Sequence, residues 1–213
     1  MSETLVMESA TTVNKKSPEK PKPVSAAKTK PQTAAVATAP AAASIEAYRD
    51  YVRKIAAIQD GKETIQNKTR AHAGVLLAAL LEKAAKEVNV LCGALDDDVF
   101  GTSEVVEAAV SFLKRPGTKM NVVLEAPLTF AQSKFLSALR DRDVMGNVIL
   151  HFAPAQLVNL YPFRFLVADG LHYRFQLNRE KFDAIAKFGR SVEAKRLLKA
   201  FSAIRSRSNK YSP

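Results

Sequence analysis

The chain has 213 residues, of which 47% are hydrophobic, and this length and composition suit one globular domain of ordinary size with an appendage. Its single cysteine excludes an internal disulfide and a cysteine-based metal site. No apolar run approaches the roughly 18 residues that span a bilayer, and the N-terminus lacks the features of a secretory signal, so we expect a cytoplasmic protein without membrane insertion.

The net charge of +11 is concentrated toward the C-terminus. Residues 164–213 contain twelve Lys or Arg against four Asp or Glu, whereas residues 41–163 contain fourteen of each kind. A local excess of positive charge attracts polyanions or acidic protein surfaces, and charge alone does not choose between them.

The N-terminal part of the sequence predicts a disordered tail followed by helices. Residues 1–43 are rich in Ala, Pro and Lys and have few apolar residues to bury. From Ser44, a good N-cap, apolar residues recur at spacings of three and four as far as Ile58, which predicts an N-terminal helical segment within 44–64. A second and more apolar helix is expected over about 63–86.

The remainder alternates between short apolar runs and helical patterns. The expected elements are a strand over 87–95, a helix over 103–115, a strand over 119–127, a helix over 130–141, a strand over 147–153, two antiparallel strands over 163–169 and 172–178, and helices over 179–188 and 191–205. Strands that alternate with helices in this way predict an α/β fold with a mixed β-sheet flanked by helices.

Three segments of this pattern resemble a half-unit of the phospholipase D-like superfamily, closest to its small single-unit members. They are the helix and strand over 76–95 with the acidic turn after them, the strand over 120–125 with its helix, and the late pair of strands "FRFLVADGLHYRFQLN" before a helical C-terminus. The resemblance covers about residues 65–208, which places a phospholipase D-like domain in residues 65–213.

The family signature is H-x-K-x4-D, often followed by Gly-Ser and then Asn, and its histidine attacks phosphorus while its lysine stabilises the phosphate oxygens. In the stretch "YPFRFLVADG", Asp169 fits the aspartate, which the resemblance places in the same charged network. Arg164 then stands where the lysine should be, and Pro162 stands where the histidine should be. Gln176 and Leu177 replace Gly-Ser, and Asn178 lies one residue early.

The degenerate motif implies a pseudoenzyme. Proline has no nucleophile, whereas an arginine keeps a cation that can bind phosphate through two donors. The competing interpretation is an ordinary hairpin strand, in which Arg164 simply pairs with an acid.

Other reactive side chains give weaker signals. His72, His151 and His172 do not have the spacing of metal ligands, and His151 is the best candidate for a displaced nucleophile. The acidic run 96–98 is more typical of a solvated turn than of a metal site, and Cys92 is typical of a core residue. The sequence has no Gly-rich phosphate loop and no G-x-S-x-G motif, so we expect no cofactor and no metal.

The C-terminal helix is amphipathic, with an apolar face formed by Val192, Leu197, Leu198, Phe201 and Ile204. Its other side is basic and is typical either of a solvated surface or of contacts to a nucleic-acid backbone. The candidate residues for binding phosphate or nucleic acid are Arg164, Arg174, Lys195, Arg196, Lys199 and Arg205.

Three functions remain open from the sequence. The first is a catalytically inactive module that binds a protein, as an inhibitor or adaptor of a larger bacterial machine such as one that transfers plasmid DNA in conjugation. The second is a module that binds nucleic acid irrespective of sequence, and the third is a phosphodiesterase with a displaced nucleophile. The resemblance also implies a homodimer, because single-unit members bring two half-sites together.

Overall fold

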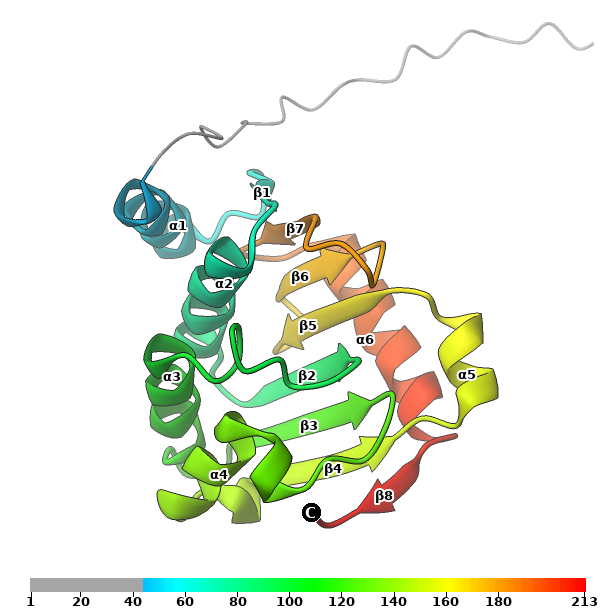
Figure 1. Cartoon of the computed structure of the whole chain (residues 1–213). Helices are drawn as coiled ribbons and strands as arrows, with labels where there is room; N and C mark the ends of the chain where they lie inside the picture. The colour runs from blue at the N-terminus through cyan, green and yellow to red at the C-terminus, as the bar shows by residue number, and fades with distance from the viewer. Residues whose placement is uncertain (1–43) are drawn as a thin grey trace, which may run out of the picture. The chain divides into compact units, whose positions relative to one another are not determined.

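The computed structural model describes residues 44–213, so the tail expected over 1–43 lies outside the described residues. The described part contains one eight-stranded sheet with helices on both faces (Figure 1). Its α-helices are α1 (Ile45–Ile58), α2 (Arg70–Lys83), α3 (Ser103–Leu113), α4 (Lys134–Asp141), α5 (Ala155–Leu160) and α6 (Val192–Arg205). Its strands are β1 (Ile65–Asn67), β2 (Glu87–Cys92), β3 (Lys119–Leu124), β4 (Val148–Phe152), β5 (Arg164–Ala168), β6 (His172–Gln176), β7 (Ala184–Lys187) and β8 (Asn209–Tyr211).

The sheet has the strand order β1-β7-β6-β5-β2-β3-β4-β8. Strands β2, β3 and β4 are parallel, and each of the other neighbouring pairs is antiparallel. Parallel strands need crossover connections, which α3 and α4 supply here. The predicted mixed sheet flanked by helices is therefore confirmed.

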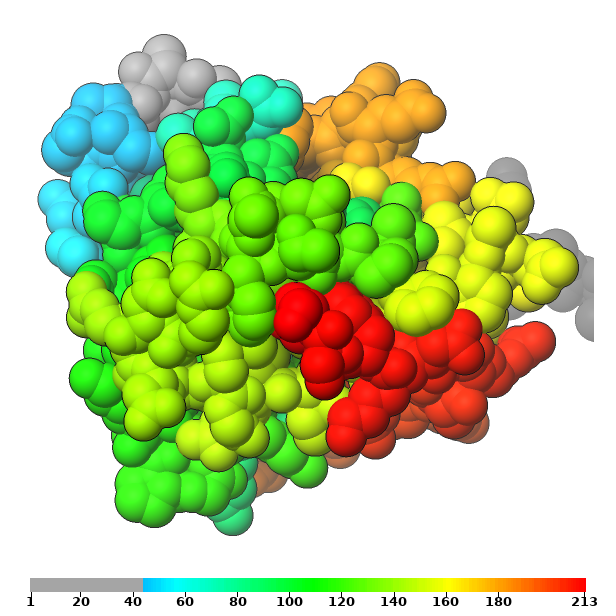
Figure 2. Space-filling model, turned by 60° about the horizontal axis from the view of Figure 1, so that its bottom comes forward, coloured from blue at the N-terminus to red at the C-terminus, as the bar shows by residue number. Residues whose placement is uncertain are grey.

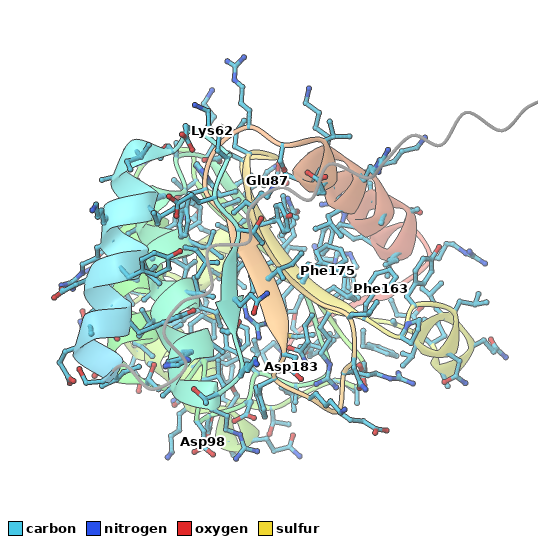
Figure 3. The ribbon with its side chains drawn as sticks, turned by 90° about the horizontal axis from the view of Figure 1, so that it is seen from above. Lys62, Glu87, Asp98, Phe163, Phe175 and Asp183 are labelled. Atoms are coloured by element: carbon cyan, nitrogen blue, oxygen red, sulfur yellow. The ribbon has the colours of Figure 1, made fainter. Side chains whose placement is uncertain are left out.

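Two hydrophobic clusters cover the two faces of this sheet. Helices α1 to α4 lie on one face and α6 lies on the other, as the view from above shows (Figure 3). Side chains alternate between the faces along each strand. Thus Val90 and Leu166 contact the α1–α4 layer, whereas Leu91 and Phe165 contact the α6 layer.

Serine and threonine side chains fix where four of the helices begin. Each accepts a hydrogen bond from a backbone N–H in the first turn, as N-cap residues do: Ser44, Thr69, Ser133 and Ser191. Helix α2 is buried around most of its circumference because its middle is almost entirely Ala, Val and Leu.

The C-terminal strand β8 covers one edge of the sheet beside β4. The Tyr211 hydroxyl accepts the backbone N–H of Leu128 at 3.2 Å, and its ring packs edge-on against Phe152. Figure 2 shows these C-terminal residues, in red, at the surface beside the green segment that follows β3.

Three sequence predictions need correction, and two elements were missed. The single helix expected over 63–86 is strand β1 followed by α2, because Thr69 caps a new helix. The helix expected over 179–188 is wrong, since strand β7 lies there and pairs with β6. Helix α5 and strand β8 were not predicted. Val192 does not join the apolar face of α6, because its side chain is 61% exposed.

None of the helices in residues 44–213 is both long enough and apolar enough to cross a membrane.

Candidate functional site

Arg164 opens strand β5 at the carboxyl-terminal ends of β2 and β3, the edge where ligands bind in many α/β sheets. Its Nε and Nη2 donate to Oε1 of Glu125 at 3.3 and 3.2 Å, and its Nη1 donates to the carbonyl of Arg179 at 3.0 Å. Gly93 makes room for this arrangement, because a Cβ at that position would overlap the guanidinium. Arg164 thus pairs with an acid, as the competing interpretation of the motif expected.

Asp169 lies at the opposite end of β5, in the hairpin turn, with a φ of 54°. Its carboxylate accepts the backbone N–H groups of Ala85, Lys86 and Glu87 at 2.5, 2.8 and 2.8 Å. Five residues of extended chain separate it from Arg164 by about 16 Å. The structure therefore does not bring Asp169 into one charged network with Arg164, and its carboxylate anchors the start of β2 instead.

The remaining motif positions are divided between the surface and the sheet. Pro162 is exposed in the segment before β5. Gln176 is buried and lies opposite Arg164 in the β5–β6 pair, whereas Leu177 is 71% exposed. The side-chain oxygen of Asn178 accepts the backbone N–H of Glu180 at 2.8 Å, so it serves a local turn.

Arg174 lies two residues before Gln176 on β6, on the same face of the sheet, and is 7% exposed. It lines a cavity of about 70 Å³ together with Arg164, Gln176, Cys92, Asp96 and Phe182. Burial lowers the pKa of Arg174 to about 10, which leaves the guanidinium protonated at neutral pH. Two of the predicted phosphate-binding residues, Arg164 and Arg174, are thus brought together.

The histidines do not reach this cavity. His72 stacks on Tyr48 with ring centroids 3.9 Å apart, and His172 accepts the backbone N–H of Gly189 through Nδ1 at 2.8 Å. His151 pairs with Val123 in the sheet and therefore faces the α6 layer, opposite to Arg164. Desolvation lowers the pKa of each of the three, so they are neutral at pH 7.

Cys92 lines the cavity, but burial raises the pKa of its thiol to about 12. The thiol therefore stays protonated at neutral pH, whereas a nucleophilic cysteine reacts as its thiolate.

The acidic run 96–98 is engaged in local contacts. Asp96 and Asp98 lie 3.6 and 3.5 Å from the guanidinium of Arg70, and Asp97 accepts the backbone N–H of Lys134 at 2.9 Å. Within the part of the chain that the structure describes, no cluster of His, Cys, Asp or Glu has the arrangement of a metal site.

The other four predicted phosphate-binding residues lie on α6: Lys195, Arg196, Lys199 and Arg205. The first three are exposed, while Arg205 is half-buried with its guanidinium carbon 5.9 Å from the centre of the Phe201 ring. Because α6 and Arg174 contact opposite faces of the sheet, the six predicted residues form two separate groups.

Sequence reasoning missed the residues that hold the two arginines of the cavity. Asn67 accepts from Arg174 across 107 positions, and Glu125 accepts from Arg164 across 39 positions. No local pattern links residues so far apart. The only local signal was Gly93 directly after an apolar strand, where the absence of a side chain often marks a close approach.

Comparison with known proteins gives structural but not sequence matches. No protein-family model matches the sequence, and no curated protein matches it. The archaeal chromatin protein TrmBL2, whose structure shows a novel mode of DNA binding, superposes with a TM-score of 0.52 at 12% identity over 78% of this chain and 62% of that chain. NucT from Helicobacter pylori superposes with a TM-score of 0.50 at 10% identity over 70% of this chain and 100% of that chain.

Nuc from Salmonella typhimurium, a phospholipase D family member, has a TM-score of 0.47 at 11% identity over 65% of this chain and 90% of that chain. At identities this low, the matches show similarity of fold and not of function. NucT is a phospholipase D-family protein, and the superposition on it shows that this chain has a phospholipase D-like fold, as the sequence resemblance predicted.

Proposed function

We propose that this protein is a catalytically inactive member of the phospholipase D-like fold that works by binding, and that it binds nucleic acid along α6. The observation that supports inactivity is the place of Arg164: Pro162 precedes it, and among residues 44–213 its cavity is lined by no histidine. A phosphodiesterase of this kind needs an attacking side chain beside the cation that holds the phosphate.

The exposed side of α6 supports nucleic acid as the ligand. Lys195, Arg196 and Lys199 lie within five residues of one another on the solvent side of this helix, in a segment (164–213) with a net charge of +8. Cations spaced in this way contact phosphates irrespective of base sequence, and their binding weakens as salt rises. The similarity in fold to a DNA-binding chromatin protein agrees with this proposal.

Fluorescence anisotropy with a generic DNA duplex tests the binding. We expect the triple variant Lys195→Gln/Arg196→Gln/Lys199→Gln to weaken binding. The slope of log K against log salt should become less negative by about 2–3, because each neutralised phosphate contributes about 0.9 to that slope. The matched control is Arg53→Gln/Lys54→Gln/Lys114→Gln, which removes the same charges from exposed positions on the α1–α4 layer. Equal losses in the two variants, or no binding by the wild type at low salt, would contradict the α6 site.

Hydrolysis of a bis-aryl phosphate ester tests inactivity. We expect no turnover above the uncatalysed rate. Turnover that persists in wild-type protein and disappears in His151→Ala would instead establish the alternative of a displaced nucleophile.

A second candidate, binding of a protein as an inhibitor or adaptor, is favoured by an exposed apolar surface on β6 and β7. Leu177 and Ile185 are 71% and 37% exposed. Two hollows, of about 460 and 280 Å³, share Phe175 and Ile185, and Figure 3 shows Phe163 and Phe175 on the side of the sheet where α5 and α6 lie. Apolar surfaces of this kind often mark sites of protein association.

A pull-down compares the candidates. A partner protein retained by the α6 triple variant and lost in Leu177→Ser/Ile185→Ser would support the adaptor role. Retention by both variants would count against this surface. The homodimer stays a prediction, and the mass of the full chain in light scattering tests it.

A further inference from the structure

Arg174 is a buried cation whose hydrogen bonds all go to neutral oxygens. Its Nε donates to Oδ1 of Asn67 at 3.0 Å, its Nη1 donates to Oε1 of Gln176 at 3.2 Å, and its Nη2 lies 3.5 Å from the carbonyl of Phe182. None of the acidic side chains in residues 44–213 lies within ion-pair distance of it. A guanidinium has five N–H donors, so two remain after these three contacts.

Such an arrangement is unfavourable for the folded protein by itself. Taking a guanidinium out of water without a counter-charge costs several kcal/mol, which neutral oxygens offset only in part. The same desolvation lowers the pKa of Arg174, yet the group remains charged at pH 7. Buried charges in proteins are usually paired with an opposite charge.

The cavity beside Arg174 has the size and lining for a small anion. Its volume of about 70 Å³ compares with about 10–15 Å³ on the same measure for one water molecule. Arg164 and Gln176 supply further polar groups to the lining. The acid that lines it, Asp96, is already engaged with Arg70 and with the backbone N–H of Asp98.

We propose that this cavity binds a small tetrahedral oxyanion of the phosphate class, held by the two remaining N–H groups of Arg174 with Arg164 and Gln176 beside it. Arg174, Asn67 and Phe182 all stand outside the motif, so the buried cation and two of the three oxygens that it contacts are not motif residues. It is too small for a base or a sugar in addition to the anion. It lies across the sheet from α6, and it is therefore independent of the proposed nucleic-acid surface.

Thermal unfolding of the full chain in low-millimolar inorganic phosphate tests the site, against a constant excess of chloride that fixes the ionic strength. We expect Tm to rise with saturation, by about 3–6 °C at a tenfold excess over the dissociation constant. Arg174→Gln should lose this response, because it removes the cation. The α6 triple variant should keep it, and this difference separates the cavity from the nucleic-acid surface.

The rate at which a disulfide reagent labels Cys92 gives a second readout that needs no substitution. Cys92 is the single cysteine and lines the same cavity, so a bound anion should slow labelling with the same midpoint as the Tm rise. This measurement decides the matter if Arg174→Gln does not fold. An unchanged Tm and labelling rate in wild-type protein would overturn the site, as would an undiminished Tm response in Arg174→Gln.

Discussion

Arg164 and Asp169, at the two ends of β5, have different roles, although the spacing of one motif joins them in the sequence. Arg164 is half-buried at the cavity and is fixed by Glu125, whereas Asp169 accepts three backbone N–H groups at the start of β2. Hydrogen bonds to a charged group contribute more than neutral ones, and losing them leaves amides without partners. Asp169 is therefore expected to matter for stability and not for binding.

Asp169→Asn tests this assignment. Asparagine tolerates the positive φ of this turn, so the backbone stays unstrained while the charge and one acceptor oxygen are lost. We expect the free energy of unfolding to fall by about 1–3 kcal/mol in a urea titration, with unchanged affinity for DNA and an unchanged response to phosphate. Asp183→Asn, at an exposed position, should change stability by less than about 0.5 kcal/mol. A loss of DNA or phosphate binding without a loss of stability would show instead that Asp169 belongs to a binding site.

At the scale of elements, strand β7 shows how pairing overrides a local pattern. Phe182, Ile185 and Phe188 recur at a spacing of three, which predicts a helix. In the fold the segment pairs with β6, so that Ala184 and Ala186 are buried and Ile185 is exposed on the other face. The segment therefore alternates as a strand does, and it pairs with the strand that directly precedes it in the sequence.

Substitutions along β7 distinguish the alternation of a strand from the spacing of a helix. Ala186 has no exposed surface, and Ala186→Leu should overpack the core between the sheet and the α1–α4 layer and lower the free energy of unfolding by about 1–3 kcal/mol. Ile185→Thr, one residue earlier on the opposite face, should be tolerated within about 1 kcal/mol because threonine suits a partly exposed strand. Chemical denaturation measures both, and a reversed order of costs would contradict the observed register.

The elements that could be predicted are those whose signal is local. Strands β2 and β3 are apolar runs buried on both faces, and α6 has its N-cap at Ser191 directly before an amphipathic stretch. Strand β1 has three residues, too few to show an alternation. The same holds for the candidate site. Arg164 could be identified from its own strand. The neutral environment of Arg174 could not, because it depends on Asn67, whose position relative to β6 only the completed sheet determines.

For the whole molecule, buried histidines make stability depend on pH. Desolvation lowers the folded-state pKa of His172 below its unfolded value near 6.5, so the unfolded state binds the proton more readily. Stability is therefore fully present above pH 6.5 and is lost as the pH falls below it, by up to about 1.4 kcal/mol per pH unit for each histidine that stays neutral. His172→Asn, whose Oδ1 can accept the N–H of Gly189, should flatten this slope in urea titrations between pH 7.5 and 5. The half-buried His151→Asn should flatten it less.

The sheet also separates the two groups of cations, the cavity arginines and the exposed cations of α6. Arg174 contacts the α1–α4 side, and α6 carries its exposed charges on the other side, so neither group can touch a ligand bound at the other. Distant sites without shared partners contribute independently, typically within about 0.5 kcal/mol.

In a combined variant of Arg174→Gln with the α6 triple substitution, the loss of DNA affinity should equal that of the triple variant, and the loss of the phosphate response should equal that of Arg174→Gln. Saturating phosphate should likewise leave DNA binding unchanged at fixed ionic strength. If phosphate instead competes with DNA in wild-type protein and no longer competes in Arg174→Gln, the nucleic acid reaches the cavity, and the two groups act as one site.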